Sequence, residues 1–216
     1  FFYVLDRVTG EFISGEPFVK VSWALGMSKD GRPIINPKAF YDQKDPIAIL
    51  PPSGGGHNWS PMSYNPATGL VYIPSFYTTF TLGAHAQYKA GTTGFIRPTG
   101  DPRLVEPAYG PEPPPGARGG LQAWDPVTQK LRWNIEGGGG IGGGTTTTAG
   151  NLVFQVINDG PFRAISADKG EILRIQPPTL LVHTHWSDVS GLPDEPTNYQ
   201  QVTWALAGNG GSTRLT

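Results

Sequence analysis

The sequence predicts an all-β protein built as a β-propeller, and two observations support this fold class. First, a turn frame that leads into a short apolar strand occurs four times along the 216 residues. Second, the anchors of the four frames are separated by 59, 60 and 41 positions, and a repeat of about 40 residues with longer insertions is typical of propeller blades. The anchors are Asp6, Asn65, Asp125 and Ser166.

Each frame is predicted to be a β-turn between two neighbouring strands. An Asp or Asn side chain can bond to the backbone amides of its own turn, and a glycine takes the positive φ. Trp124 and Trp133 flank the third turn, and because that frame repeats as structure we expect both to pack within blades rather than to form a stacking platform for sugars. The strands expected after the turns cover residues 11–14, 70–73, 130–133 and 171–174.

The clearest blade is predicted between residues 150 and 176. Residues 151–157 are apolar enough for an inner strand, and Asn158-Asp159-Gly160 is a hairpin signal. Residues 162–166 alternate in polarity, and residues 171–175 make the next expected strand.

Two long connections separate these units. Residues 16–57 contain a turn at residues 29–33 and several short apolar segments. Residues 75–120 have few strand signals and many prolines and glycines, and long loops in compact domains are usually functional lids or linkers. We interpret residues 75–120 as an ordered excursion over one end of the propeller, with a linker between domains as the alternative.

One segment does not follow the repeat. Residues 137–148 read as a run of glycines, interrupted by Ile141, followed by four threonines. A flexible linker would explain this composition, but the segment comes directly before the strand expected at Asn151, where a blade should start. An error in the assigned residues is therefore a second interpretation.

The composition limits the kind of protein and its partners. With 216 residues, of which 38% are apolar and 15% charged, the chain is long enough to bury a sizeable core. Its net charge of -1 provides no electrostatic field that would attract nucleic acid. There is no cysteine, and no apolar run of about 18 residues that would span a membrane. Residues 1–7 read as a strand already in progress, which predicts that an N-terminal neighbour is missing.

Four stretches together resemble the quinoprotein alcohol dehydrogenases that use pyrroloquinoline quinone (PQQ). The resemblance covers nearly the whole chain, and it implies an eight-bladed β-propeller of which residues 1–216 form roughly the C-terminal half, within a single domain. The matching stretches, in the family's order and rough spacing, are residues 2–10, 56–66, 121–126 and 147–155.

The resemblance also implies how the site is divided along the protein. In the family PQQ lies in the central channel, a bound Ca²⁺ polarises its reactive carbonyl, and an Asp acts as the base on the alcohol. The base and the main Ca²⁺ ligands belong to motifs upstream of Phe1, so we expect no catalytic residue and no metal ligand in this chain.

The chain is expected to hold one side of the cofactor. Asn58 corresponds to the family's amide that contacts the quinone, and Trp59 lies beside it. Ile141 and Gly142 fall in a second cofactor-contacting segment, where the family has Trp-Asn; the missing indole removes a large flat contact surface. For Asn58, an amide that only satisfies its own turn remains the alternative.

The activity implied by the resemblance is oxidation of primary or secondary alcohols, or of sugars or polyols, to aldehydes or ketones. The expected partners are an alcohol substrate and a cytochrome c or quinone acceptor, with haem c if a further domain exists, and the expected location is the bacterial periplasm. This chain alone would be inactive. The competing hypothesis is a non-enzymatic propeller that binds protein or polysaccharide, since a fold does not determine a function.

The histidines are weak candidates for chemistry. His57 lies beside a glycine turn, where a histidine more often forms scaffold hydrogen bonds than acts as an acid or base. His183 and His185, with Asp188 nearby, have a spacing that would let a strand bind a metal, but a convincing third ligand is absent. We therefore expect an exposed loop there.

Overall fold

The computed structural model describes residues 1–41, 45–83, 101–137, 143–157, 162–173, 180–185, 200–209 and 212–215. These residues form β-strands, turns and one short 3₁₀ turn, which confirms the all-β prediction. The chain divides into two compact units, Phe1–Leu173 and Arg174–Thr216. The described part of the chain contains no helix with the length and apolar character needed to cross a membrane.

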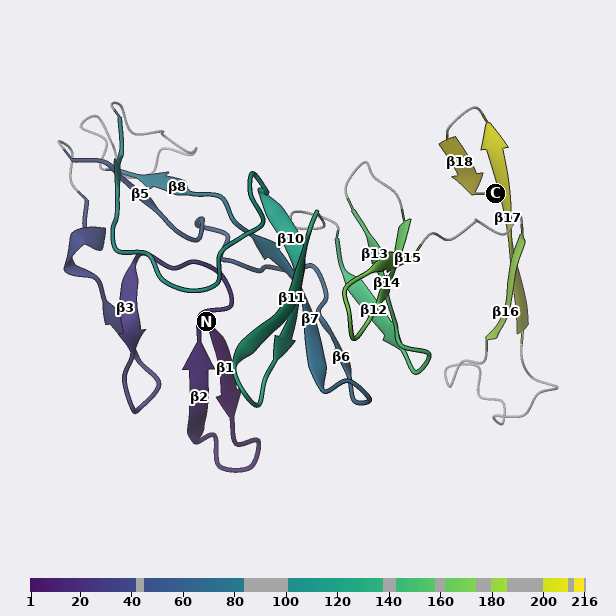
Figure 1. The fold of residues 1–216 in the computed structure, drawn as a ribbon, viewed down its shortest axis with the longest axis horizontal. Helices are drawn as coiled ribbons and strands as arrows, with labels where there is room; N and C mark the ends of the chain where they lie inside the picture. The colour runs from purple at the N-terminus through teal and green to yellow at the C-terminus, as the bar shows by residue number, and fades with distance from the viewer. Residues whose placement is uncertain are drawn as a thin grey trace, which may run out of the picture. The chain divides into compact units, whose positions relative to one another are not determined.

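A four-stranded antiparallel sheet lies at the centre of the first unit (Figure 1). Its last two strands follow the predicted excursion at residues 75–120, which itself contains the short strands β8 (Phe80–Leu82) and β9 (Arg103–Leu104). The sheet has the order β6 (Ser63–Asn65), β7 (Leu70–Phe76), β10 (Gly119–Asp125) and β11 (Lys130–Glu136).

The next sheet, also four-stranded and antiparallel, contains the blade that the sequence predicts most clearly. Three of its strands lie where they are expected: β13 (Leu152–Val156), β14 (Phe162–Ser166) and β15 (Ile172–Leu173). The sheet begins earlier than expected, because β12 (Thr145–Thr148) pairs with β13 along its whole length. The threonine run is therefore a sheet-edge strand, for which its β-branched side chains are well suited.

The remaining strands of the first unit belong to smaller sheets. β1 (Phe2–Leu5) pairs with β2 (Phe12–Glu16), and β3 (Ala24–Met27) pairs with β4 (Pro33–Ile35). After the 3₁₀ turn at Pro37–Ala39, β5 (Ile47–Ile49) pairs antiparallel with β8 and parallel with β9. The second long connection thus folds back onto the first.

The four repeated frames are tight turns between antiparallel strands, as predicted. Asp6 accepts hydrogen bonds from the Val8 and Thr9 amides, both at 2.8 Å, and Asp125 accepts equivalent bonds in its own turn. These amide donors, Thr9 and Thr128 above all, lower the pKa of both carboxyls. The residue that closes each turn has a positive φ: 76° at Gly10, 70° at Gly69, 55° at Gln129 and 74° at Gly170.

Aromatic side chains join the neighbouring sheets. The Tyr72 ring stacks on Trp133 with a centroid separation of 5.6 Å, and both residues donate a hydrogen bond to the Ala167 carbonyl, at 3.0 and 3.1 Å. Burial raises the pKa of Tyr72, so its hydroxyl keeps the proton that it donates. Trp124 is only 2% exposed and lies against Phe2 of β1. The packing role predicted for both tryptophans is confirmed.

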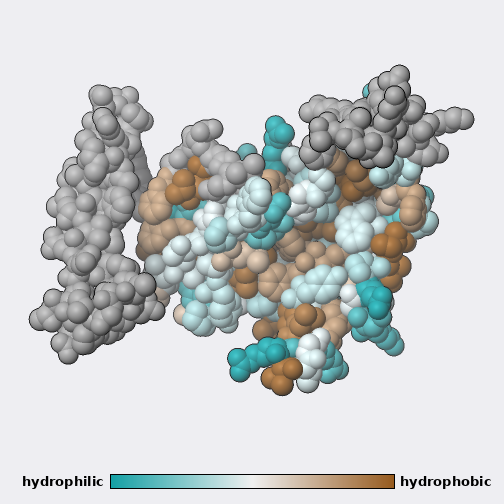
Figure 2. Space-filling view, turned by 180° about the vertical axis from the view of Figure 1, so that it is seen from behind, coloured by the Kyte–Doolittle hydropathy of each residue, from teal (hydrophilic) through white to brown (hydrophobic). Residues whose placement is uncertain are grey.

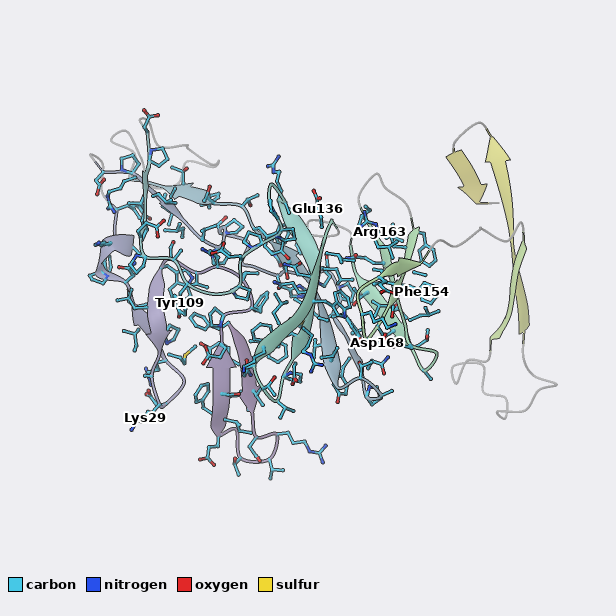
Figure 3. The ribbon with its side chains drawn as sticks, in the orientation of Figure 1. Lys29, Tyr109, Glu136, Phe154, Arg163 and Asp168 are labelled. Carbon is cyan, nitrogen blue, oxygen red and sulfur yellow. The ribbon has the colours of Figure 1, made fainter. Side chains whose placement is uncertain are left out.

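Polar contacts complete this junction at its edge. Arg163 of β14 donates from Nη1 to the Glu136 carbonyl of β11 at 2.8 Å, and Figure 3 shows the two residues at the same end of their sheets. On the surface, hydrophobic and hydrophilic residues are interspersed on the face seen in Figure 2.

In the second unit, the described residues form one three-stranded antiparallel sheet. Its strands are β16 (Leu180–His185), β17 (Gln200–Asn209) and β18 (Ser212–Leu215). His183 and His185 lie on β16, opposite Val202 and Gln200, so the expectation of a loop is wrong. The apolar and β-branched residues around them favour a strand. Asp188 lies outside the described residues.

Replacing Asn65 by Asp is expected to destabilise the protein by about 2 kcal/mol, because Asn65 is 2% exposed and joins two sheets. Its Nδ2 donates to Thr147 Oγ1 at 3.0 Å and to the Thr148 carbonyl at 3.2 Å. A carboxylate would lose both bonds and face a carbonyl oxygen. Urea unfolding of the complete protein measures the change. The matched control is Asp125→Asn at the same turn position, with an expected cost under about 1 kcal/mol; equal costs would contradict the prediction.

Candidate functional site

The segment that carries the predicted cofactor residues, residues 54–62, lies beside the end of β7. The Gly55 amide donates to the Pro52 carbonyl at 2.8 Å, and Gly55 has a φ of +83°, which favours glycine. The Gly56 carbonyl then accepts from the Phe76 amide at 2.8 Å. The glycines therefore make a tight turn that places the chain against the edge of the central sheet.

His57 holds the next position of this segment. Its Nδ1 lies 2.8 Å from the Pro74 carbonyl oxygen. Because a carbonyl only accepts, Nδ1 carries the hydrogen and donates it. The scaffold hydrogen bond expected for His57 is confirmed.

The far end of the segment is held by the neighbouring sheet. Thr145, the first residue of β12, donates to the Pro61 carbonyl from its backbone amide at 2.9 Å and from its hydroxyl at 3.3 Å. The same hydroxyl lies 2.8 Å from Ser63 Oγ. Gly144 packs so closely that a Cβ added there would be 2.6 Å from Pro61 Cδ. The contact thus joins the 54–62 segment to the strand that follows the glycine run.

Between these two anchors, the chain presents an amide and an indole to solvent. Asn58 is exposed, and Trp59 is 75% exposed, an unusually open position for the largest side chain. The Asn58 amide lies next to Gly54, where an added Cβ would be 3.4 Å from Nδ2. Ile141 and Gly142 lie outside the described residues. Of the four predicted cofactor residues, the structure therefore describes only these neighbouring two.

We call residues 54–62, with the exposed Asn58 and Trp59, the cofactor wall. Its composition limits the chemistry that it can perform. No Asp, Glu, Lys or Arg occurs from residue 46 to residue 88. In the described residues, no three His, Cys, Asp or Glu side chains are grouped so as to hold a metal ion. The wall can donate hydrogen bonds and offer a flat aromatic surface, but it carries no carboxylate that would take a proton. These properties fit one side of a planar, carbonyl-bearing ring such as PQQ.

A cavity of about 700 Å³ opens beside the same segment. Most of its lining is apolar or aromatic, and it comes from residues 1–3, the 18–23 and 49–57 stretches, Met62 and Ile73. The sequence did not predict this cavity, because its walls come from separate segments and no motif marks them. The anchor at Thr145 was missed for the same reason, although the Gly-Thr step after the glycine run was a visible signal.

Several curated proteins similar to this chain are named quinohemoprotein or quinone-linked alcohol dehydrogenases. A quinohemoprotein alcohol dehydrogenase of Comamonas testosteroni is 43% identical over 175 residues, which are 80% of this chain and 25% of that protein. The quinohemoprotein alcohol dehydrogenase ADH IIB of Pseudomonas putida is 37% identical over an alignment that covers 100% of this chain and 30% of that protein. The chain belongs to the quinoprotein alcohol dehydrogenase family. No family model matches the sequence.

Solved structures of quinoprotein dehydrogenases confirm a partial propeller. The crystal structure of the Comamonas testosteroni quinohemoprotein alcohol dehydrogenase aligns with a TM-score of 0.67 at 33% identity, covering 95% of this chain and 30% of that one. A europium-containing methanol dehydrogenase aligns with a TM-score of 0.66 at 29% identity, covering 95% and 34%. The chain therefore spans about a quarter to a third of the length of the relatives that it matches.

Proposed function

We propose that this chain supplies one wall of the cofactor site in a PQQ-dependent alcohol dehydrogenase. The observation that carries the proposal is the anchored 57–62 segment, which leaves Asn58 and Trp59 exposed where two sheets meet. The names of several relatives support the chemistry, since these are quinohemoprotein or quinone-linked alcohol dehydrogenases.

In this proposal the residues of the chain orient the cofactor, as proteins do in cofactor enzymes generally. Asn58 donates an amide hydrogen to a quinone oxygen, and Trp59 covers part of the ring face. Ile141 and Gly142 are proposed as further cofactor contacts, on the family resemblance of their segment. Bound PQQ supplies the acceptor for the hydride of the alcohol. The proton of the alcohol goes to a base outside residues 46–88, where this chain has no carboxylate.

The remaining features concern the complete protein. We propose primary or secondary alcohols as substrates, a cytochrome c or quinone as electron acceptor, and the bacterial periplasm as the location. Ca²⁺ is the proposed metal, with ligands mostly outside this chain, while one structural relative is described as containing europium. A haem c domain is proposed because several relatives are quinohemoproteins.

Released cofactor and restored activity test this function directly. The complete protein is purified and denatured, and the supernatant is examined for PQQ by absorbance. A second sample is supplied with Ca²⁺ and PQQ and assayed for dye reduction with ethanol. Either PQQ release or PQQ-dependent dye reduction is expected. An intact preparation that shows neither result contradicts the proposal and favours a binding module.

Replacing Trp59 by Ala is expected to weaken PQQ binding about ten-fold, because a flat contact worth about 1.4 kcal/mol is lost. Titration of the apo form of the complete protein with PQQ, followed by fluorescence, gives the half-saturating concentration. Trp59→Phe is the matched control, since it retains an aromatic face, and its expected change is under about three-fold. If both variants bind as the wild type does, Trp59 does not contact the cofactor.

A further inference from the structure

We infer that His57 is a positioning residue for the cofactor wall. Its imidazole supplies the hydrogen-bond donor that a longer β6 would provide at the edge of β7, and thereby directs Asn58 and Trp59 outward. This inference rests on the proposed function for its consequence, but its structural part stands on the contacts of residues 56–57 with β7.

The edge of β7 that faces β6 is only partly paired by a strand. β6 pairs with Leu70–Tyr72, through Asn65 opposite Leu70 and Ser63 opposite Tyr72. β7 continues to Phe76, so its second half extends past the end of β6. On that second half the Phe76 amide is bonded to Gly56, and the Pro74 carbonyl is bonded to His57. Residues 56–57 thus stand where a longer β6 would lie.

Proline at position 74 explains why a side chain makes the second bond. In an antiparallel ladder a hydrogen-bonded residue exchanges both a donor and an acceptor with its partner. Pro74 has no amide hydrogen and needs only a donor for its carbonyl. The imidazole supplies this donor while the backbone of His57 remains free to turn away from the sheet. Asn58, the next residue, therefore leaves the sheet edge and faces solvent.

Loss of the imidazole would remove the anchor that lies next to Asn58. Pro74 is buried, so its carbonyl would lose its donor in a place that water reaches poorly, which is unfavourable. The other end would remain bonded to Thr145 through Pro61. The Gly56 carbonyl would keep its bond to the Phe76 amide, but the anchor adjacent to Asn58 would be lost, so more of the ordering of the amide and indole would have to occur when the cofactor binds.

The test compares His57→Phe, which keeps a ring and removes the donor, with His57→Asn, whose Nδ2 is as many bonds from Cα as Nδ1 of histidine. In the apo form of the complete protein, hydrogen exchange of the amides of residues 57–60 should accelerate about ten-fold in His57→Phe and remain near wild type in His57→Asn. PQQ titration should show binding about ten-fold weaker than wild type for His57→Phe. For His57→Asn the weakening of PQQ binding should be under about three-fold. If His57→Phe fails to fold, His57→Ala takes its place, since it adds no bulk.

The inference would be overturned by unchanged exchange at residues 57–60 in the variants without a donor, or by changes in exchange and PQQ affinity in His57→Asn as large as those in His57→Phe. A general structural defect would accelerate exchange across β7 and lower the unfolding temperature without this local pattern, and it would also contradict the inference. The exchange measurement is made without PQQ. If the wild type does not bind PQQ while the exchange pattern is as expected, the proposed function fails and the positioning of the segment by His57 stands.

Discussion

Gly170→Ala is expected to lower the free energy of unfolding by about 4 kcal/mol, the sum of a conformational and a packing penalty. Gly170 closes the turn before β15 with a φ of +74°, a conformation that costs about 1–2 kcal/mol for a residue with a Cβ. An added Cβ would lie 2.6 Å from Trp133 Cδ2 and 2.9 Å from Cε3. Trp133 has little freedom to retreat, because it stacks on Tyr72 and donates to the Ala167 carbonyl.

Two other turns of the same kind allow the conformational penalty to be measured without the packing penalty. Gly10 and Gly69 close their turns with φ values of 76° and 70°, and nothing lies within 4 Å of a Cβ added at either. Gly10→Ala and Gly69→Ala should therefore cost only the conformational term, about 1–2 kcal/mol. Urea unfolding of the complete protein gives all three values. Equal costs at the three positions would show that Trp133 moves aside freely, and would refute the packing argument.

The turns were predictable from sequence because their chemistry is local. The anchor side chain, the amides that it binds and the residue with positive φ lie within five positions of one another, as from Asp6 to Gly10. Gln129 shows that the frame tolerates a substitute for glycine. Its side chain compensates by accepting from Trp124 Nε1 at 3.3 Å and donating to Ser14 Oγ at 3.0 Å, so the strained residue also links two sheets.

The parts that sequence reasoning missed depend on partners far along the chain. Thr145–Thr148 form a strand because they pair with β13 and bond to residues about 80 positions earlier, including Ser63 and Asn65. Composition alone shows a low-complexity run. In the same way, Asn58 and Trp59 were found through a resemblance, whereas the anchors that hold them, Pro74 and Thr145, become visible only when the sheets are assembled.

Gly56→Ala should damage stability and cofactor binding together, because Gly56 lies between the core and the cofactor wall. A Cβ added at Gly56 would be 2.4 Å from Val19 Cγ2 and 3.3 Å from Cγ1. Val19 is 2% exposed and belongs to a cluster with Phe18, Ile73 and Trp124, so it cannot move without disturbing that core. The expected cost is about 3 kcal/mol in unfolding free energy. Displacement of the Gly56–Phe76 bond should also weaken PQQ binding about ten-fold.

A second substitution tests whether the clash itself is the cause. Val19→Ala removes both methyl groups that the new Cβ would meet, at a cost of about 2 kcal/mol when made alone. In the double variant Gly56→Ala with Val19→Ala, the alanine methyl occupies part of the vacated space, so the two costs should fall short of additivity by about 2 kcal/mol. PQQ binding should recover with the stability, because the same atoms control the position of residues 56–59. Additive costs, or recovered stability without recovered binding, would show that Gly56 does not link the core to the wall in this way.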